Sequence, residues 1–454
     1  MVKIFTLFLF LVLTAGFLFV LTVSKAANAQ SSNTDPHVPG QILVEFKTGV
    51  PSSMVNNVLQ GVSAKQTGSI DKLHVLIISV PKTSENTVLT TLQHNPNVDY
   101  AEFNYIGHAF LTPNDTYFAA NQWFLQNTGQ VINGITGTVG ADIKATQAYD
   151  ISEGSSNVRV AILDSGINVN HEDLAGKIVA NTDFTNSSSG YLDVYGHGTH
   201  VAGIVGAVTN NGLGVASVCP DCALLNGKII NDNGSVTVSN VANGITWAIA
   251  NKAKVINLSL GWTTGSRTLL NAVNYAWNNG AVVVAAAGNL GNTNLVYPAS
   301  YQNVISVAAT DNTDQLASFS TYGTWVDMAA PGDYVFSTWK DSTSNLAPQP
   351  VCDANGYCYK FGHGTSMSAP VVAGIVGLVF SYNPSLTNAQ VESIVENSAD
   401  KISGTGTDWI YGRADAYKAL VAAGNVTVTP TPTPTPTVSV TVTPTPTPKP
   451  HGKH

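Results

Sequence analysis

Five short apolar runs constrain the fold of residues 112–424 more than any other feature of the sequence. They are rich in β-branched side chains and nearly continuous in apolar character, and they cover residues 158–163, 223–230, 255–260, 281–287 and 304–308. Strands of this kind are buried on both faces of a parallel sheet, and the helical stretches between them supply the crossovers. The sequence therefore predicts an α/β unit whose central sheet is mainly parallel, with helices on both faces. In such sheets, active sites lie at the carboxyl ends of the strands.

The first 29 residues have the pattern of a secretory signal peptide. A basic start at Lys3 precedes an apolar run over residues 4–23, and Ala27-Asn28-Ala29 has the small residues of a cleavage site. The alternative is an uncleaved membrane anchor, because the run is about as long as a bilayer-spanning helix needs. Cleavage after Ala29 predicts a secreted, extracellular chain without stable membrane insertion. Association with the cell surface stays open.

Residues 30–110 are expected to form a small unit of their own. Strand-like runs at 41–46, 74–80 and 98–105 alternate with helix-like runs at 54–60 and 84–94. This order predicts a small ferredoxin-like α+β fold. At the other end, residues 425–454 are rich in Thr and Pro; a Thr-Pro repeat over residues 429–450, interrupted at 438–443, has proline at every second position, which forbids helix and ladder pairing. We expect this tail to be an extended spacer.

Charge argues against some partners. The formal net charge is −8 and only 11% of residues are charged, so neither a nucleic-acid footprint nor a basic membrane-binding face is indicated. We expect no nucleic-acid partner and a monomeric chain.

The four cysteines form two close pairs, Cys219 with Cys222 and Cys352 with Cys358. In an oxidising compartment, an even number favours disulfides, and local bridges are the simplest pairing, although sequence does not fix the connectivity. A four-thiolate zinc site is an alternative.

Three stretches carry the residue types that nucleophilic acyl transfer requires. Asp164 follows the run 158–163, His197 lies between two glycines, and Ser366 lies just before the apolar run 371–380. A serine nucleophile needs a base for its proton, and the base needs an acid that fixes its tautomer. A serine where a loop enters a helix is also near unpaired N–H groups that suit an oxyanion, although such serines are often only helix caps.

Asn289 follows the run 281–287 and offers a side-chain amide. That amide could donate to a developing oxyanion, whereas an asparagine after glycine, taken alone, is an ordinary turn residue. Taken together, the four positions favour a catalytic role over the turn and cap readings.

These stretches resemble the signature blocks of the subtilisin-like serine proteases, or subtilases, and most of all their thermitase-like members. The blocks begin at Asp164, Gly196, Ala287 and Gly364, in the family's order Asp, His, Ser, and the resemblance covers residues 112–423. It implies a serine endopeptidase that cleaves protein or peptide substrates through an acyl-enzyme. It assigns Ser366 as nucleophile, His197 as general base and acid, Asp164 as the orienting carboxylate, and Asn289 as oxyanion donor.

The resemblance also implies a domain organisation. Residues 111–424 become the catalytic domain, and residues 30–110 become an inhibitor-like propeptide that is removed by self-processing between residues 105 and 112. The substrate is then expected to pair with an edge strand and to fill a pocket for an apolar side chain before the scissile bond. The residues implied are Ser259, Leu260 and Gly261 for the strand, and Leu295 and Val296 for the pocket.

Structural calcium is a further implication. The implied ligands are Asp115, Asp183, Asn211 and the carbonyl oxygens of Val208, Leu213 and Val215. The alternative is that these are surface Asp and Asn residues in turns. A weaker cation site is expected near Ala299, Tyr301, Val304 and Asp327.

Two other functions are weighed against proteolysis. A non-catalytic binding module would have no physical need to keep Asp164, His197, Ser366 and Asn289 together. A lipase or esterase would have a G-x-S-x-G elbow, which the sequence around Ser366 lacks.

Overall fold

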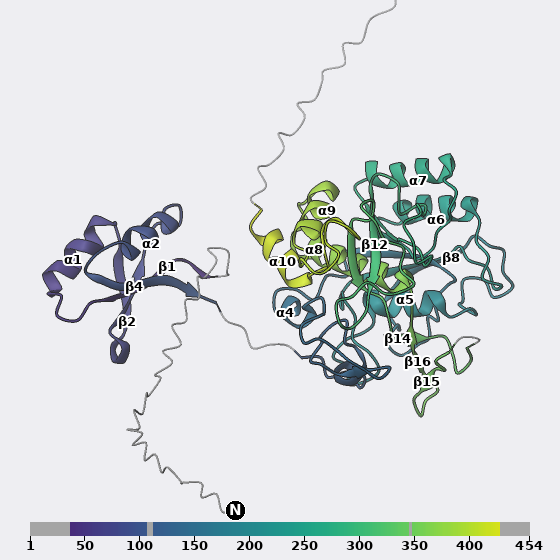
Figure 1. Cartoon of the computed structure of the whole chain (residues 1–454), viewed down its shortest axis with the longest axis horizontal. Helices are drawn as coiled ribbons and strands as arrows, with labels where there is room; N and C mark the ends of the chain where they lie inside the picture. The colour runs from purple at the N-terminus through teal and green to yellow at the C-terminus, as the bar shows by residue number, and fades with distance from the viewer. Residues whose placement is uncertain (1–36, 107–111, 345–346, 427–454) are drawn as a thin grey trace, which may run out of the picture. The chain divides into compact units, whose positions relative to one another are not determined.

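The computed structural model describes residues 37–106, 112–344 and 347–426, in two compact units that divide after Ile106 (Figure 1). The expected signal peptide and most of the Thr/Pro-rich tail lie outside the described residues. Most of the expected processing region, 105–112, lies outside them as well.

The N-terminal unit is a four-stranded antiparallel sheet with two helices. The elements are β1 (His37–Phe46), α1 (Ser52–Gly61), β2 (Lys65–Ile70), β3 (Val75–Ser79), α2 (Glu85–Gln93) and β4 (Val98–Tyr105). Their order in the sheet, β2-β3-β1-β4, confirms the ferredoxin-like fold. Sequence analysis missed β2, because this strand is almost wholly exposed and has no apolar alternation.

The second unit is built on a seven-stranded sheet in which every pairing is parallel. In the order β13-β12-β11-β10-β7-β9-β8, its strands are Met328–Pro331, Val304–Thr310, Val282–Ala286, Ala253–Leu258, Arg159–Asp164, Ala223–Lys228 and Ile178–Asp183. The five central strands are the five predicted runs. The two edge strands, β8 and β13, were not predicted, since β8 is half-exposed and ends in three polar residues and β13 has only four residues.

Helices cover both faces of this sheet, because alternate side chains of each strand enter one of two cores. On one face lie α5 (His197–Gly206), α8 (Thr365–Tyr382), α9 (Asn388–Asn397), α10 (Ala416–Gly424) and the short α4 (Ala145–Tyr149). On the other face, α6 (Val238–Ala250) and α7 (Arg267–Asn278) lie side by side (Figure 1). A further short helix, α3 (Phe118–Asn121), lies near the start of the unit. The expected α/β architecture is confirmed.

Helix α8 is the centre of the first core. In the described part of the chain it is the one helix long and apolar enough to span a membrane, but 83% of its apolar window is buried inside the protein. It packs against strands β7, β10, β11, β12 and β13. Its burial identifies it as a core helix.

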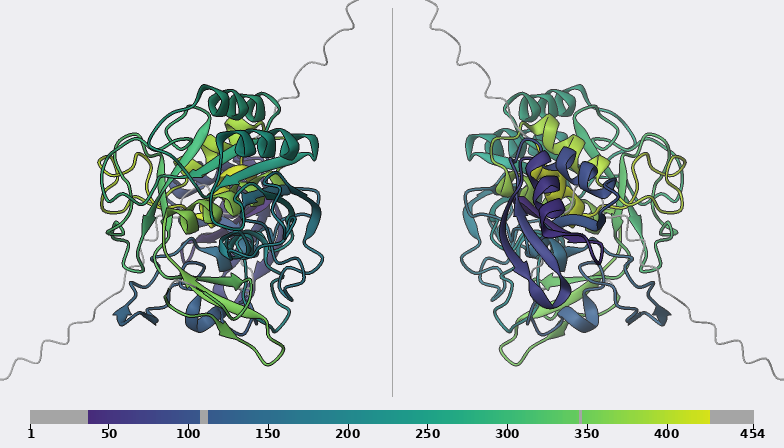
Figure 2. Two further views of the ribbon diagram at one scale, coloured as in Figure 1. Left: turned by 90° about the vertical axis from the view of Figure 1, so that its right-hand side faces the viewer. Right: turned by 90° about the vertical axis from the view of Figure 1, so that its left-hand side faces the viewer.

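A three-stranded antiparallel sheet of β14 (Val335–Trp339), β16 (Cys358–Gly362) and β15 (Val351–Cys352) projects from this unit (Figure 2). A two-residue pair, β5 (Val131–Ile132) with β6 (Ile135–Thr136), forms a separate hairpin.

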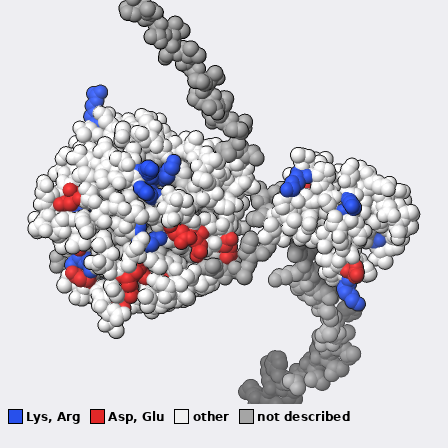
Figure 3. All heavy atoms as spheres, turned by 180° about the vertical axis from the view of Figure 1, so that it is seen from behind, with Lys and Arg blue, Asp and Glu red and all other residues white. Residues whose placement is uncertain are grey.

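Cysteines pair locally, as Cys219–Cys222 and Cys352–Cys358, which confirms disulfides in place of the zinc alternative. Charged side chains are scattered over the face drawn in Figure 3.

Candidate active site

Asp164 and His197 meet at the carboxyl end of the sheet. Asp164 is the last residue of β7 and is buried, and His197 is the first residue of α5. The His197 Nδ1 lies 2.8 Å from Asp164 Oδ1 and 3.0 Å from Oδ2. Burial lowers the pKa of His197, but the charge of Asp164 and its hydrogen bond raise the pKa more, to a net value above the ordinary one. With Nδ1–H donating to the carboxylate, Nε2 remains as the basic nitrogen.

Ser366 is the second residue of α8 and forms a reciprocal pair with Ser259. Its Oγ donates to the Ser259 carbonyl oxygen at 3.1 Å, and the Ser259 Oγ donates to the Ser366 carbonyl oxygen at 2.8 Å. Pro370 lies four residues later and has no N–H, so the Ser366 carbonyl has no helical partner and is left for Ser259. Sequence analysis predicts Ser259 on the substrate strand, and in the structure its side chain also holds the start of α8.

Asn289 is oriented by Thr365. Its Oδ1 accepts the Thr365 N–H at 2.9 Å and the Thr365 Oγ1 at 3.0 Å. An amide whose oxygen is bound in this way has its two N–H donors free for other partners. Asn289 and Ser366 both line the same pocket. Gly364 has φ +130°, and a Cβ there would come within 3.0 Å of Asn289 Nδ2, so the close approach requires glycine.

The pocket beside Ser366 has a volume of about 200 Å³. The predicted residues Leu260, Gly261 and Val296 line it, but Leu295 is 46% exposed and is not among the lining residues. Val296 is held closely, since a Cβ on Gly261 or Gly288 would approach its methyl groups to 2.6 or 2.9 Å. Sequence reasoning missed several lining residues, namely Trp262, Thr263, Ala286, Gly288, Leu290 and Thr365.

The segment at Leu260 and Gly261 has backbone hydrogen-bonding groups that are left without partners in the described structure. Trp262 and Tyr297 exchange two backbone hydrogen bonds, of 2.8 and 2.7 Å, which anchor the segment. Among the described residues, none of the backbone hydrogen bonds outside helices and strands involves Leu260 or Gly261. Unpaired N–H and C=O groups of an extended segment can pair with another extended chain.

Asp193 is a supporting residue that sequence reasoning did not assign to this site. Its buried carboxylate accepts the Gly196 N–H (2.7 Å), the Thr199 N–H (2.9 Å) and the Ser165 hydroxyl (3.0 Å). It therefore ties the first turn of α5 to the residue after Asp164. The sequence pattern that could have identified Asp193 is an acid shortly before the start of a helix, where unpaired N–H groups favour a carboxylate.

The structure brings together only part of the predicted cation ligand set. The Asp183 carboxylate caps the turn after β8, where it accepts the N–H groups of Thr185 (2.7 Å) and Ser187 (3.0 Å). Asp173 instead accepts the Asn211 side-chain amide (2.9 Å) and the Val215 N–H (2.8 Å). Asp173 replaces Asp183 in the candidate set.

The remaining oxygens fit a cation. Asp115 Oδ2 accepts the Asn210 N–H at 3.0 Å, whereas its buried Oδ1 has no hydrogen-bonding partner among the described residues. Burial raises the pKa of Asp115, and it raises the pKa of Asp173 to about 6. Among the described residues, the carbonyl oxygens of Val208, Leu213 and Val215 accept no backbone hydrogen bond outside helices and strands. No cluster of three or more His, Cys, Asp or Glu side chains suited to a metal is found there, so a cation would depend on amide and carbonyl oxygens.

Two other histidines have structural partners. His200 is buried, its Nε2 lies 2.9 Å from the Lys360 carbonyl oxygen, and burial lowers its pKa to about 3. His363 Nδ1 lies 2.7 Å from Asp333 Oδ1. Asp327, from the weaker expected cation site, accepts the N–H and hydroxyl of Ser306.

The parallel sheet, the Asp164–His197 pair and the serine at the start of a buried helix define a class, the serine hydrolases with a cleft open to an extended chain. Residues 155–413 match the Subtilase family, and the chain belongs to this family. Residues 24–104 match the Fervidolysin N-terminal prodomain. The chain is thus a serine endopeptidase made as a zymogen.

Individual relatives agree with this assignment. Thermitase of Thermoactinomyces vulgaris is 48% identical over 309 residues, which cover 68% of this chain and 99% of that protein. A thermophilic serine proteinase of Bacillus sp. (strain AK1) is 40% identical over 384 residues, which cover 85% of this chain and 88% of that protein. A solved protease structure from Pseudoalteromonas arctica PAMC 21717 has a TM-score of 0.59 at 31% identity, covering 69% of this chain and 100% of that chain.

Proposed function

We propose that this serine endopeptidase cleaves peptide bonds with Ser366 as nucleophile, His197 as general base and acid, and Asp164 as the group that orients His197. The observation that carries the proposal is the contact of His197 Nδ1 with both oxygens of Asp164, at 2.8 and 3.0 Å. This contact fixes the tautomer in which Nε2 can accept the serine proton.

The proposed reaction runs through an acyl-enzyme. Ser366 Oγ leaves the Ser259 carbonyl, gives its proton to His197 Nε2 and attacks the scissile carbonyl carbon. The oxyanion accepts hydrogen bonds from the Asn289 amide and the Ser366 N–H. His197 then protonates the leaving amine. A water molecule, deprotonated by His197, hydrolyses the ester and restores the serine.

The proposed substrate is an extended segment of a protein. Its backbone would pair with Leu260 and Gly261, whose outward groups are open. The side chain before the scissile bond would enter the pocket beside Ser366, where Val296 and Ala286 make apolar contacts. This favours apolar side chains at that position.

Calcium is proposed as a structural ion, held by oxygen atoms of residues that are distant in sequence. The ligands would be Asp115, Asp173, Asn211 and the carbonyl oxygens of Val208, Leu213 and Val215. When bound, Ca²⁺ neutralises two buried carboxylates and links residue 115 to the loop 207–215. The support is the unpartnered Oδ1 of Asp115 and the three free carbonyl oxygens.

We further propose that residues 1–29 are a signal peptide and that residues 30–110 are an inhibitor-like propeptide removed by the enzyme itself. The mature catalytic domain would cover residues 111–424 and act outside the cell as a monomer. The prodomain match over residues 24–104 supports the propeptide.

The test is digestion of an unfolded protein by the purified mature chain, with and without a serine-directed phosphonyl inhibitor. We expect inhibitor-sensitive proteolysis, and we expect Ser366→Ala to have none. Ser368→Ala is the matched control, because this buried hydroxyl lies on the same helix and has no hydrogen-bonding partner in the described structure. Proteolysis by the Ser366→Ala chain would refute the assignment of the nucleophile.

A further inference from the structure

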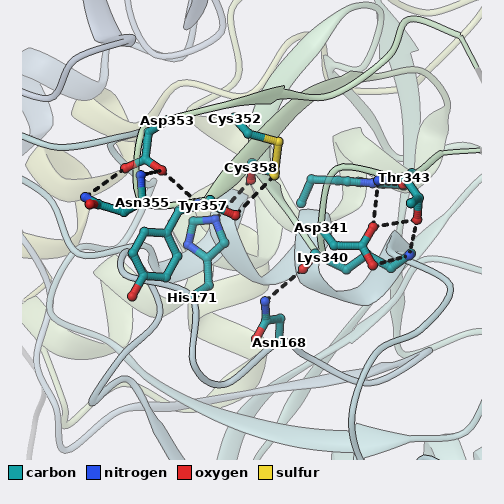
Figure 4. The surroundings of a disulfide bond; sticks show 12 residues. Asn168, His171, Lys340, Asp341, Thr343, Cys352, Asp353, Asn355, Tyr357 and Cys358 are labelled. Atoms are coloured by element: carbon teal, nitrogen blue, oxygen red, sulfur yellow. Dashed lines mark hydrogen bonds and ion pairs between the residues drawn. A yellow bond between two sulfur atoms is a disulfide. The ribbon is translucent and has the colours of Figure 1, made fainter.

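The hairpin of β15 and β16 contacts the segment that carries Asp173. Cys352 and Cys358 face each other in this hairpin and are joined by a disulfide. Figure 4 shows the His171 ring beside the Cys358 end of the hairpin. The His171 Nδ1 accepts the Asp173 N–H at 3.2 Å, so the ring carries its hydrogen on Nε2, which donates to the Cys358 carbonyl oxygen at 3.0 Å. One buried ring therefore bridges the disulfide hairpin and the backbone of Asp173.

Tyr359 follows Cys358 and makes a second contact. Its side chain is fully buried, and its hydroxyl donates to Glu172 Oε1 at 2.7 Å. The single hydroxyl proton is thus taken by Glu172, so the hydroxyl oxygen lies beside Asp173 without donating a hydrogen bond to it. A Cβ on Gly214 would come within 2.0 Å of both the Tyr359 hydroxyl and Asp173 Oδ2, so the two oxygens lie close together above a glycine.

We propose that the disulfide-closed hairpin, residues 351–362, is an outer support of the calcium site, and that Tyr359 is the positioning residue through which it acts. The inference rests on the calcium site of the proposed function. Groups that hold a metal ligand in place strongly affect affinity, and their removal typically weakens metal binding about 10–100-fold. Asn211 and Val215 hold the Asp173 carboxylate from the loop, and Tyr359 holds the neighbouring Glu172 from a different element.

The disulfide matters because it limits the freedom of the hairpin. The turn at 354–356 is exposed, whereas Cys358 and Tyr359 are buried. Strand β16 is paired with β14 at five positions, whereas β15 is paired with β16 at only two, so without the cross-link β15 and the turn at 354–356 would be held weakly. A looser turn would give more freedom to the Cys358 end of β16, so that the Cys358 carbonyl and the adjacent Tyr359 hydroxyl would be held less firmly against His171 and Glu172.

The test measures the Kd for Ca²⁺ by competition with a chelating dye, on the mature protein blocked with a phosphonyl inhibitor. We expect Tyr359→Phe to raise the Kd about tenfold. The double variant Cys352→Ser with Cys358→Ser should raise it in the same direction by about threefold. Tyr357→Phe is the control, since it removes a hydroxyl from the same hairpin without touching Glu172 or Asp173. Thermal midpoints are measured in parallel across a Ca²⁺ titration.

The outcomes separate the two proposals. If the unmodified protein binds no Ca²⁺, the proposed calcium site fails and this inference fails with it. If it binds Ca²⁺ and Tyr359→Phe has the same Kd, only the inference is overturned. A merely structural role would lower the thermal midpoint equally at all Ca²⁺ concentrations, which would also overturn it; a deficit that disappears at saturating Ca²⁺ supports it. An unchanged Kd in the double cysteine variant would overturn the role of the disulfide.

Discussion

Thr365 precedes the proposed nucleophile and faces Asn289 with two donors. Both bind the Asn289 oxygen, and the Thr365 Oγ1 also accepts the Gly288 N–H at 3.0 Å. The orientation of the Asn289 amide thus follows from its neighbours before any substrate arrives. A donor that is already oriented stabilises a developing oxyanion without reorganising during the reaction.

Replacing Asn289 tests this role. Asn289→Ala should lower kcat about 10²- to 10³-fold and leave KM almost unchanged, because the hydrogen bond is made to the oxyanion and not to the bound substrate. Steady-state kinetics on a peptide amide measure both constants. Asn294→Ala, in an exposed part of the same loop, is the control. An equal effect of the two variants would remove Asn289 from the site.

The raised pKa of His197 predicts the pH dependence of activity. The general base must be neutral, so activity is lost as the pH falls through the pKa of His197, and the acidic midpoint of kcat/KM should lie above 6.5. Asp164→Asn removes the carboxylate charge, so this midpoint should move down, and kcat should fall roughly 10⁴-fold because the tautomer is no longer fixed. His363→Gln should leave the midpoint unchanged. A midpoint that did not respond to Asp164→Asn would contradict the pairing.

At the scale of elements, helix α9 carries two acids, the buried Glu396 and the half-buried Glu392. Burial raises the pKa of Glu392 to about 7 and that of Glu396 to about 8, and the charge of Asp327 adds to both shifts. Folding therefore favours the protonated carboxyls. Their contribution to stability is complete below the unfolded value of about 4.5 and is lost as the pH rises to about 8.

We expect the thermal midpoint of the inhibited enzyme to fall between pH 5 and pH 8, and Glu396→Gln to flatten this dependence. The amide keeps a polar group of the same size and removes the titrating group. Asp221→Asn, at an exposed carboxylate, serves as the control. An unchanged pH dependence in Glu396→Gln would show that α9 does not set it.

The loop 207–215 provides a second test at this scale, because Asp173 and not Asp183 meets it. Bound Ca²⁺ at about 100 times its Kd adds about 2.7 kcal/mol to the free energy of unfolding, so adding a chelator should lower the thermal midpoint of a domain of this size by about 4 °C. Asp173→Asn and Asp115→Asn should reduce this difference strongly, and Asp183→Asn should retain it. Loss of the chelator effect in Asp183→Asn alone would restore the original ligand set.

Elements were predictable where local sequence decides them. The five central strands are apolar on both sides, and Asp164, His197, Asn289 and Ser366 lie at the ends of strands or at the starts of helices. Edge strands lack this signal, since β8 is half-exposed and β2 is almost entirely polar. Asp173 was missed because its contact with Asn211, 38 residues later, depends on the path of a loop and not on a local pattern. The exposure of Leu295 was missed for the same reason, since it also depends on the path of a loop.

For the whole molecule, the two units predict a maturation step. The Ser366→Ala chain should remain at precursor length, because the proposed nucleophile also cleaves the propeptide. The N-terminal sequence and mass of the purified protein measure this, with Ser368→Ala as control. Normal trimming of the Ser366→Ala precursor would rule out self-cleavage.

The central helix α8 has a consequence for synthesis. It covers strands β7, β10, β11, β12 and β13, and it carries Ser366, yet it follows all of these strands in the chain. A ribosome therefore completes the sheet and the partners of the nucleophile first, and the helix that closes the core arrives afterwards. Until then, α5 covers only part of that face, and the proposed nucleophile is missing. Closure of the core and delivery of the proposed nucleophile thus depend on the same helix, so a chain that ends before α8 has neither.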